Sequence, residues 1–105
     1  MHTRNRVWSI GLIGQEKFQR EIIKVISNRN LNDKEKILRK MDKNPSNYVM
    51  NNLSNGQEPV LSIIKTPGNT RFIRNILTGC FLSDYLVFLI DCTSSASIFS
   101  DIERY

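Results

Sequence analysis

The sequence predicts an α/β domain in which a mostly parallel sheet is covered by helices on both faces, in three layers. Short apolar runs of strand length alternate with stretches whose apolar residues recur at helical spacing. Strands that alternate with helices in this way form parallel sheets through right-handed crossovers. The 105 residues, of which 40% are hydrophobic and 24% charged, suffice for one folded domain with a modest core.

Three strands are predicted. Residues 7–14 are mostly apolar and end in a glycine, residues 59–65 precede a Thr-Pro-Gly-Asn turn, and residues 84–92 hold the longest apolar run. Continuous apolar runs are typical of strands that are buried on both faces of a parallel sheet. In such sheets ligands bind at the carboxyl ends of the strands. Gly14, the turn and the end of the third strand are therefore expected to meet at one edge.

Three helices are predicted between these strands. Residues 18–26 carry apolar side chains at near-helical spacing, with charged side chains between them. A second helix is expected to begin at Asp33, which can cap it, and to end near Lys43, before an Asn-Pro pair. A third begins near Phe72 and ends at Gly79.

The rest of this single domain, which spans residues 1–105, is predicted to be irregular. Residues 44–58 are rich in asparagine, serine and glycine, so we expect a loop there. Residues 1–5 and 93–105 are expected to be loosely ordered.

Composition excludes several classes of function. The sole histidine, His2, lies at the amino terminus, so neither a histidine-based metal site nor a catalytic triad is expected. Cys80 and Cys92 lack C-x-x-C spacing and are expected to be buried free thiols. No apolar run has the length of a membrane span, and the first residues lack the pattern of a secretory signal. We therefore expect a cytoplasmic protein with no metal, no bound cofactor and no membrane partner.

Charge is distributed unevenly along the chain. Residues 1–75 hold 14 of the 15 lysines and arginines and six acidic residues. Residues 76–105 hold one arginine and four acidic residues. A basic surface of this kind favours a polyanionic partner such as RNA, although many soluble helices carry surplus lysine for solubility alone. The residues predicted to contact nucleic acid are Arg4, Arg6, Arg20, Lys24, Arg29, Lys34, Lys36, Arg39, Lys40 and Lys43.

One stretch has the motifs of a known family. Residues 60–69 read V-L-S-I-I-K-T-P-G-N, residues 72–79 read F-I-R-N-I-L-T-G, and residues 83–91 read S-D-Y-L-V-F-L-I-D. This stretch resembles elongation factor 1-alpha, a translational GTPase with a strand, the motif D-A-P-G-H, a helix close to F-I-K-N-M-I-T-G and a strand beginning Ala-Asp. A weaker similarity covers residues 8–14 and 31–40. The resemblance implies a shortened, degenerate P-loop GTPase domain.

The resemblance places residues 14–18 where the family has its phosphate loop. That loop, G-x-x-x-x-G-K-[S/T], wraps phosphates with backbone N–H groups, neutralises them with lysine and holds magnesium with a hydroxyl. Here it is three residues too short, lacks the second glycine and has Phe18 in place of the hydroxyl residue. Glu16 adds negative charge where phosphate would lie. Lys17 is either a relic of the phosphate lysine or an ordinary solvated lysine.

The turn after the second strand also lacks residues that the family uses to bind magnesium and nucleotide. In the family, the aspartate of D-x-P-G helps to hold magnesium, the glycine amide meets the γ-phosphate, and the following histidine orients the attacking water. Lys65 replaces the aspartate, and Asn69 replaces the histidine. The positive charge of Lys65 would either repel magnesium or itself occupy the empty metal site. The later N-K-x-D and S-A-x motifs are missing from these residues. The vestigial nucleotide-site positions are Gly14, Lys17, Lys65, Pro67, Gly68 and Asn69.

These departures predict a non-catalytic GTPase-like protein, not an enzyme, that binds the ribosome, RNA or the translation machinery. Two alternatives stay open. The chain is a protein–protein interaction module, or an inhibitor that imitates its parent factor and binds a translation-factor protein. Otherwise it is a residual guanine-nucleotide-binding protein that uses Lys17, Gly68 and the amides of the turn.

Overall fold

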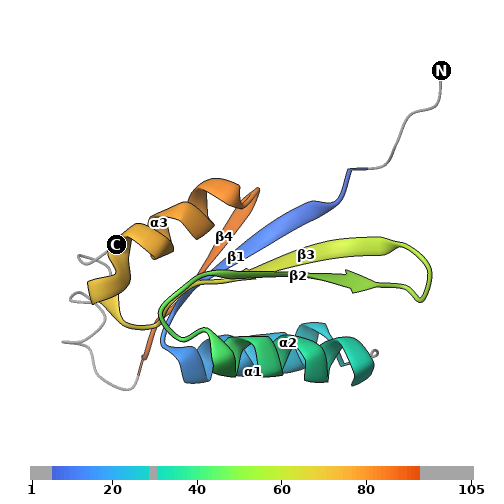
Figure 1. Ribbon diagram of the computed structural model, residues 1–105, viewed down its shortest axis with the longest axis horizontal. Coiled ribbons are helices and arrows are strands. Elements are labelled where there is room, and N and C mark those ends of the chain that lie inside the picture. The colour runs from blue at the N-terminus through green and yellow to red at the C-terminus, as the bar shows by residue number, and fades with distance from the viewer. Residues whose placement is uncertain (1–5, 29–30, 93–105) are drawn as a thin grey trace.

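The computed structural model describes residues 6–28 and 31–92, within which the chain forms a four-stranded mixed sheet and three α-helices (Figure 1). The predicted α/β class is confirmed. The predictions for residues 1–5 and 93–105, and for Arg4 and Arg29, lie outside the described residues. The elements are β1 (Trp8–Gly14), α1 (Glu16–Ile26), α2 (Leu31–Lys43), β2 (Val49–Ser54), β3 (Pro59–Lys65), the 3-10 turn η1 (Thr70–Phe72), α3 (Ile73–Leu82) and β4 (Tyr85–Leu89).

The strand order β2-β3-β1-β4 places β1 between two parallel neighbours. Leu12 of β1 pairs with Lys65 of β3 on one side and with Val87 of β4 on the other. The carboxyl ends of these three strands therefore lie at one edge of the sheet, as the sequence predicts. Strand β2 runs antiparallel to β3, which makes the sheet mixed.

The prediction of a loop over residues 44–58 is wrong for its central part, which forms β2. Leu53 is buried in the core and Asn51 faces the same side, while Met50 and Asn52 are exposed. Asparagine is a poor strand former, but pairing with the apolar β3 overrides that preference here. The tight turn from Asn55 to Glu58 makes this pairing local, because Asn55 N–H donates to Glu58 O at 3.1 Å.

Two predicted helix ends are also shifted. Helix α3 continues past Gly79 to Leu82, and this glycine serves close packing instead of ending the helix. A Cβ on Gly79 would lie 2.8 Å from Thr66 Cγ2, so α3 approaches β3 closely there. Helix α2 begins at Leu31 and not at Asp33, whose carboxylate accepts a hydrogen bond from Ser54 N–H at 3.1 Å.

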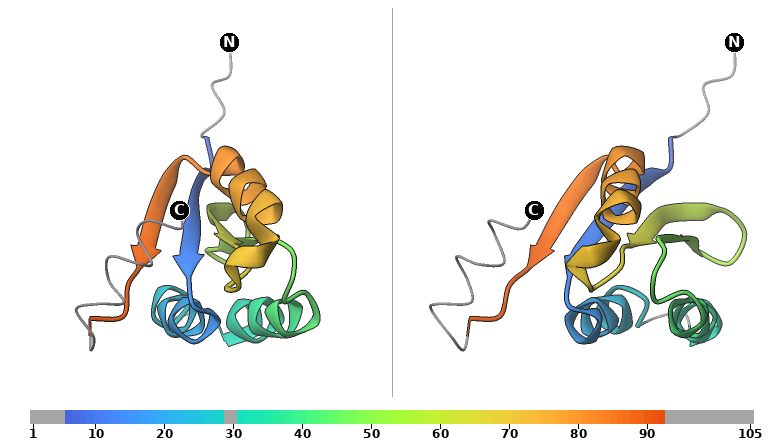
Figure 2. Two further views of the ribbon diagram at one scale, coloured as in Figure 1. Left: turned by 90° about the vertical axis from the view of Figure 1, so that its left-hand side faces the viewer. Right: turned by 60° about the vertical axis from the view of Figure 1, so that its left-hand side comes forward.

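Helices α1 and α2 cover one face of the sheet and α3 covers the other (Figures 1 and 2). The main core lies between the sheet and the α1–α2 layer. None of the helices in the described part of the chain is long and apolar enough to span a membrane. The buried side chains of this core are Leu12, Ile23, Ile37, Met41, Leu53 and Ile63.

Candidate functional site

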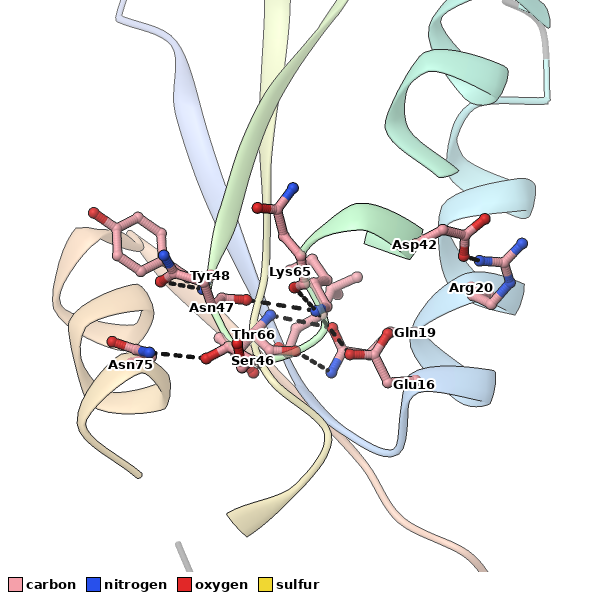
Figure 3. Close-up of polar contacts among 12 residues, drawn as sticks. Glu16, Gln19, Arg20, Asp42, Ser46, Asn47, Tyr48, Lys65, Thr66 and Asn75 are labelled. Carbon is pink, nitrogen blue, oxygen red and sulfur yellow. Dashed lines mark hydrogen bonds and ion pairs between the residues drawn. The ribbon is translucent and has the colours of Figure 1, made fainter. Parts of the chain in front are cut away.

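A buried glutamine links the carboxyl ends of β1 and β3. Gln19, in the second turn of α1, has no exposed surface. Its Nε2 donates to Gly14 O at 2.8 Å and to Thr66 O at 3.0 Å, and its Oε1 accepts from Thr66 N–H at 3.2 Å (Figure 3). Thr66 Oγ1 in turn donates to Leu12 O at 2.7 Å. The edge where a ligand would enter is therefore held together by hydrogen bonds within the chain.

Beside Gln19 lies an ion pair between a buried lysine and the first residue of α1. The side chain of Lys65 is 1% exposed, and its Nζ lies 2.7 Å from Glu16 Oε1 (Figure 3). The same ammonium donates to Asn44 O at 2.9 Å and to Asn47 O at 3.5 Å. Burial of an ammonium is tolerated only when it is paired and hydrogen-bonded, and these contacts meet that requirement.

The turn after β3 lies directly against the start of α1. A Cβ on Gly68 would be 2.9 Å from both Glu16 N and Glu16 Cγ, and 3.4 Å from Gly14 O. Pro67, within this turn, is buried. The close approach leaves no room for even a methyl group between Gly68 and the first residue of α1.

The six positions predicted to be vestiges of a nucleotide site are only partly brought together. Gly14, Lys65 and Gly68 lie close together at the carboxyl edge of the sheet. Gly68 is packed against Glu16 and Gly14, and Lys65 forms an ion pair with Glu16. Lys17 is exposed, with its Nζ 5.0 Å from the centre of the Phe18 ring, a cation–π contact within its own helix. Asn69 caps η1 by accepting a hydrogen bond from Arg71 N–H at 3.0 Å.

Sequence reasoning did not identify Gln19 as part of this site. A signal was available, because Gln19 precedes the buried Ile23 by four residues and so lies on the same face of the helix. A polar side chain on a buried face needs hydrogen-bond partners. Those partners are backbone groups at the ends of β1 and β3, which the spacing alone does not reveal.

The predicted nucleic-acid-binding residues within the described part of the chain fall into two groups. Seven of the eight belong to α1 and α2, and Arg6 precedes β1. An ion pair between Arg20 and Asp42 joins the two helices, and Lys24 Nζ lies 3.1 Å from Glu21 Oε1. On α2, Lys34 is half-buried and the others are exposed: Lys36, Arg39, Lys40 and Lys43.

An apolar surface lies on the other side of the molecule, over α3 and β4. Phe81 is the most exposed of its side chains, at 85%. The other large apolar side chains exposed there are Leu77, Leu82, Leu86 and Phe88.

At the amino end of the sheet, Asp84 is held by β1. Its Oδ2 accepts hydrogen bonds from Ser9 N–H at 2.8 Å and from Ser9 Oγ–H at 3.0 Å, and its Oδ1 pairs with Arg6. The hydrogen bond from the Ser9 backbone is the main cause that lowers the pKa of Asp84. Desolvation opposes it, and the Ser9 hydroxyl and the Arg6 charge add smaller effects that lower the pKa.

The lowered pKa of Asp84 predicts an acid-dependent loss of stability. Because the folded pKa is below the unfolded value of about 3.9, the stabilisation is present above pH 4 and is lost as pH falls through the folded pKa. Asp84→Asn should therefore be less stable than the wild type at pH 6, with the difference shrinking below about pH 4. Urea unfolding across this range measures it, with Asp42→Asn as the control for removing a surface carboxylate. A constant difference at all pH values would contradict the prediction.

Within residues 6–28 and 31–92, no group of three or more cysteine, acidic or histidine residues is arranged to hold a metal ion. Cys80 is half-buried, and burial raises the pKa of its thiol. The prediction that both thiols are buried is wrong for Cys92, which is exposed just beyond the end of β4.

Comparison with known proteins finds no family model that matches the chain, and no curated protein or solved structure that is similar to it.

Proposed function

We propose that this chain is a non-catalytic, GTPase-like protein that binds RNA, on the ribosome or elsewhere in the translation machinery, through the outer side of α1 and α2. Two features together carry the proposal. The Lys65–Glu16 ion pair and the contact of Gly68 with Glu16 close the carboxyl edge of the sheet, and the basic helices α1 and α2 cover one of its faces. The GTPase-like part of the proposal rests on the resemblance of residues 60–91 to the motifs of elongation factor 1-alpha.

The ion pair at the carboxyl edge supports a non-catalytic role. Magnesium-dependent phosphoryl transfer needs a cavity whose amides and cations surround the phosphates. Here the carboxylate of Glu16 lies at the start of α1, where it would repel phosphate, and Lys65 is already paired with it. Gly68 is packed against Glu16, which favours a closed edge over a residual nucleotide site.

The charge of the α1–α2 layer supports a polyanionic partner. The two helices hold eight lysines and arginines and five aspartates and glutamates, a difference of three positive charges. Two of those five acidic side chains are directed toward the rest of the fold, since Glu16 pairs with Lys65 and Asp33 accepts from Ser54. The surplus of positive charge on the outer side is therefore larger than the count alone indicates.

Binding measured by fluorescence anisotropy of a labelled single-stranded RNA tests this proposal. We expect affinity to fall steeply with salt, because each neutralised phosphate contributes about 0.7 to the slope of log K against log salt for single strands. Replacing both Arg39 and Lys40 by glutamine should lower that slope by about 1.4 and weaken binding at low salt. Salt-independent binding, or none at low salt, would rule the proposal out.

A matched control uses two cations on the opposite side of the molecule. Arg71 and Arg74 are exposed in η1 and α3, and replacing both by glutamine removes the same charge. We expect this pair to change the salt slope far less than the α2 pair. Equal effects would mean that net charge, and not the α1–α2 surface, determines binding.

A protein–protein interaction module is the second candidate, and the exposed apolar side chains of α3 and β4 favour it. Exposed apolar patches of this kind mark interaction surfaces in many soluble proteins. A partner protein captured from lysate after nuclease treatment, and lost in Phe81→Ser, would support this candidate over RNA binding. Titration calorimetry with GTP and GDP separates both from residual nucleotide binding.

A further inference from the structure

Two aromatic side chains form an exposed pair at the amino end of the sheet. Trp8 begins β1 and Tyr85 begins the neighbouring β4. Their ring centres are 5.6 Å apart with the planes tilted by 43°, and the residues are 46% and 59% exposed. Large aromatic residues in a small domain are normally buried much more deeply than this.

The geometry of the layers explains why this pair is uncovered. Trp8 and Tyr85 lie on the sheet face that α1 covers, because side chains alternate along a strand and both are two residues from members of that core, Ile10 and Val87. The 11 residues of α1 span about 16 Å, whereas the seven residues of β1 span about 23 Å. Starting from the carboxyl end, α1 is too short to reach Trp8. Figure 1 shows the amino end of β1 turned away from α1 and α2.

A cation accompanies the aromatic pair and is held in place. The Arg6 guanidinium lies 4.5 Å from the centre of the Trp8 ring. It also pairs with Asp84, whose carboxylate is fixed by Ser9 N–H at 2.8 Å. The arginine and the aspartate neutralise each other, so the charged groups that flank the rings are paired. The guanidinium covers part of Trp8, and Tyr85 is the more exposed of the two residues.

We propose that Tyr85 and Trp8 stack on a base of a single-stranded RNA whose phosphates lie against α1 and α2. This inference rests on the proposed RNA-binding function and adds a site at the end of the sheet opposite the Lys65–Glu16 pair. Proteins that bind single strands combine a basic track for the backbone with aromatic side chains for the bases. Duplex bases are already stacked on each other, so the site selects single strands.

The position of the site relative to the basic layer supports this assignment. Helix α1 runs from the carboxyl edge back toward the amino end of β1, so its last turn, with Lys24, lies toward the end of the sheet that carries Trp8. Because β1 turns away from α1 there, an RNA strand that contacts the last turn of α1 would have to extend beyond the helix to place a base on the rings. The neutral Arg6–Asp84 pair makes the site better suited to an uncharged base than to a phosphate.

Trp8 is the only tryptophan in the chain, so its fluorescence reports on this site alone. We expect a 12-nucleotide oligouridylate or oligoadenylate to change Trp8 emission at the same concentrations at which anisotropy detects binding. Heparin, a polyanion without bases, should displace the RNA but leave Trp8 emission near that of the free protein. Equal emission changes with heparin and RNA would overturn the stacking site.

Variants of Tyr85 provide the second test. Tyr85→Ala should weaken single-strand binding by between about 5-fold and about 150-fold without changing the salt slope, because one stacked base is lost and no phosphate contact. Tyr85→Phe keeps the ring and should bind like the wild type, which separates stacking from any loss of folding in the alanine variant. Phe81→Ala, which removes an exposed ring from α3, is the matched control and should not change RNA affinity.

The two proposals can fail separately. The stacking site would be overturned, and the proposed function left standing, if RNA binding is salt-dependent while Trp8 emission is unchanged and Tyr85→Ala binds RNA as tightly as the wild type. Absence of RNA binding at low salt would overturn both.

Discussion

Replacing Glu16 by alanine is expected to lower the free energy of unfolding by about 3 kcal/mol or more, a large share of the stability of a domain of this size. The loss is large because the charged partner, Lys65, remains in the structure. Lys65 is 1% exposed, so its ammonium cannot regain hydration unless the structure opens. Removing one partner of a buried ion pair leaves an uncompensated charge, which is among the most destabilising of single changes.

The reverse change should be milder, because the two partners are not equally buried. Glu16 keeps 35% of its side-chain surface exposed, so although Oε1 is buried, the side chain can turn its carboxylate toward water after Lys65→Met. The double variant Glu16→Ala with Lys65→Met removes both charges and should be more stable than Glu16→Ala alone. Urea unfolding with a constant m value measures all three variants.

A surface pair on the same helix provides the control. Glu21 and Lys24 are 69% and 46% exposed, and Glu21→Ala should change stability by no more than about 0.5 kcal/mol. A Glu16→Ala variant as stable as Glu21→Ala would mean that the carboxyl edge is open to water and that Lys65 is hydrated there. A double variant less stable than Glu16→Ala would contradict the role of Lys65 as the uncompensated charge.

The ion pair between Lys65 and Glu16 bears on function as well as stability. A phosphate could contact Lys65 only by displacing Glu16, so the ion pair argues against a phosphate ligand at this lysine. The contacts of Lys65 with Asn44 O and Asn47 O add a second restraint from the segment that leads into β2. The edge at which α/β proteins usually bind ligands is thus used here to hold α1, β3 and this segment together.

Much of the fold could be predicted because it depends on local signals. The apolar runs that became β1, β3 and β4 and the helical spacing of α1 are properties of neighbouring residues. Strand β2 was missed because half of its six residues are asparagine or serine, and only the pairing with β3, beyond a tight turn, makes it a strand. Local composition does not contain that pairing.

The candidate sites were harder to predict because they depend on distant contacts. Glu16 and Lys65 each stood out as unsuited to a nucleotide, yet their 49-residue separation in sequence hides the fact that they are 2.7 Å apart. Trp8 and Tyr85 are brought together only by the register of β1 with β4. Such contacts follow from strand order, which spacing along the chain does not specify.

Gly14→Ala is the second change expected to have a large effect, with a loss of about 2–6 kcal/mol. Gly14 has φ 136°, a conformation that side chains rarely adopt and that costs alanine about 1–3 kcal/mol. In addition, a Cβ there would lie 2.5 Å from Leu89 O, a backbone atom of β4 that cannot rotate away. Crowding of this kind adds about 1–3 kcal/mol.

Gly56 separates the two contributions. It too has positive φ, at 107°, but a Cβ there would meet nothing within 4 Å, so Gly56→Ala should cost only the conformational strain of about 1–3 kcal/mol. Thermal unfolding should show a fall in Tm for Gly14→Ala that exceeds the fall for Gly56→Ala by roughly 5 °C or more. Equal losses would mean that β1 and β4 can separate at Gly14 at little cost. The carboxyl edge would then have room to open, and the closed ion pair would no longer argue against a bound phosphate.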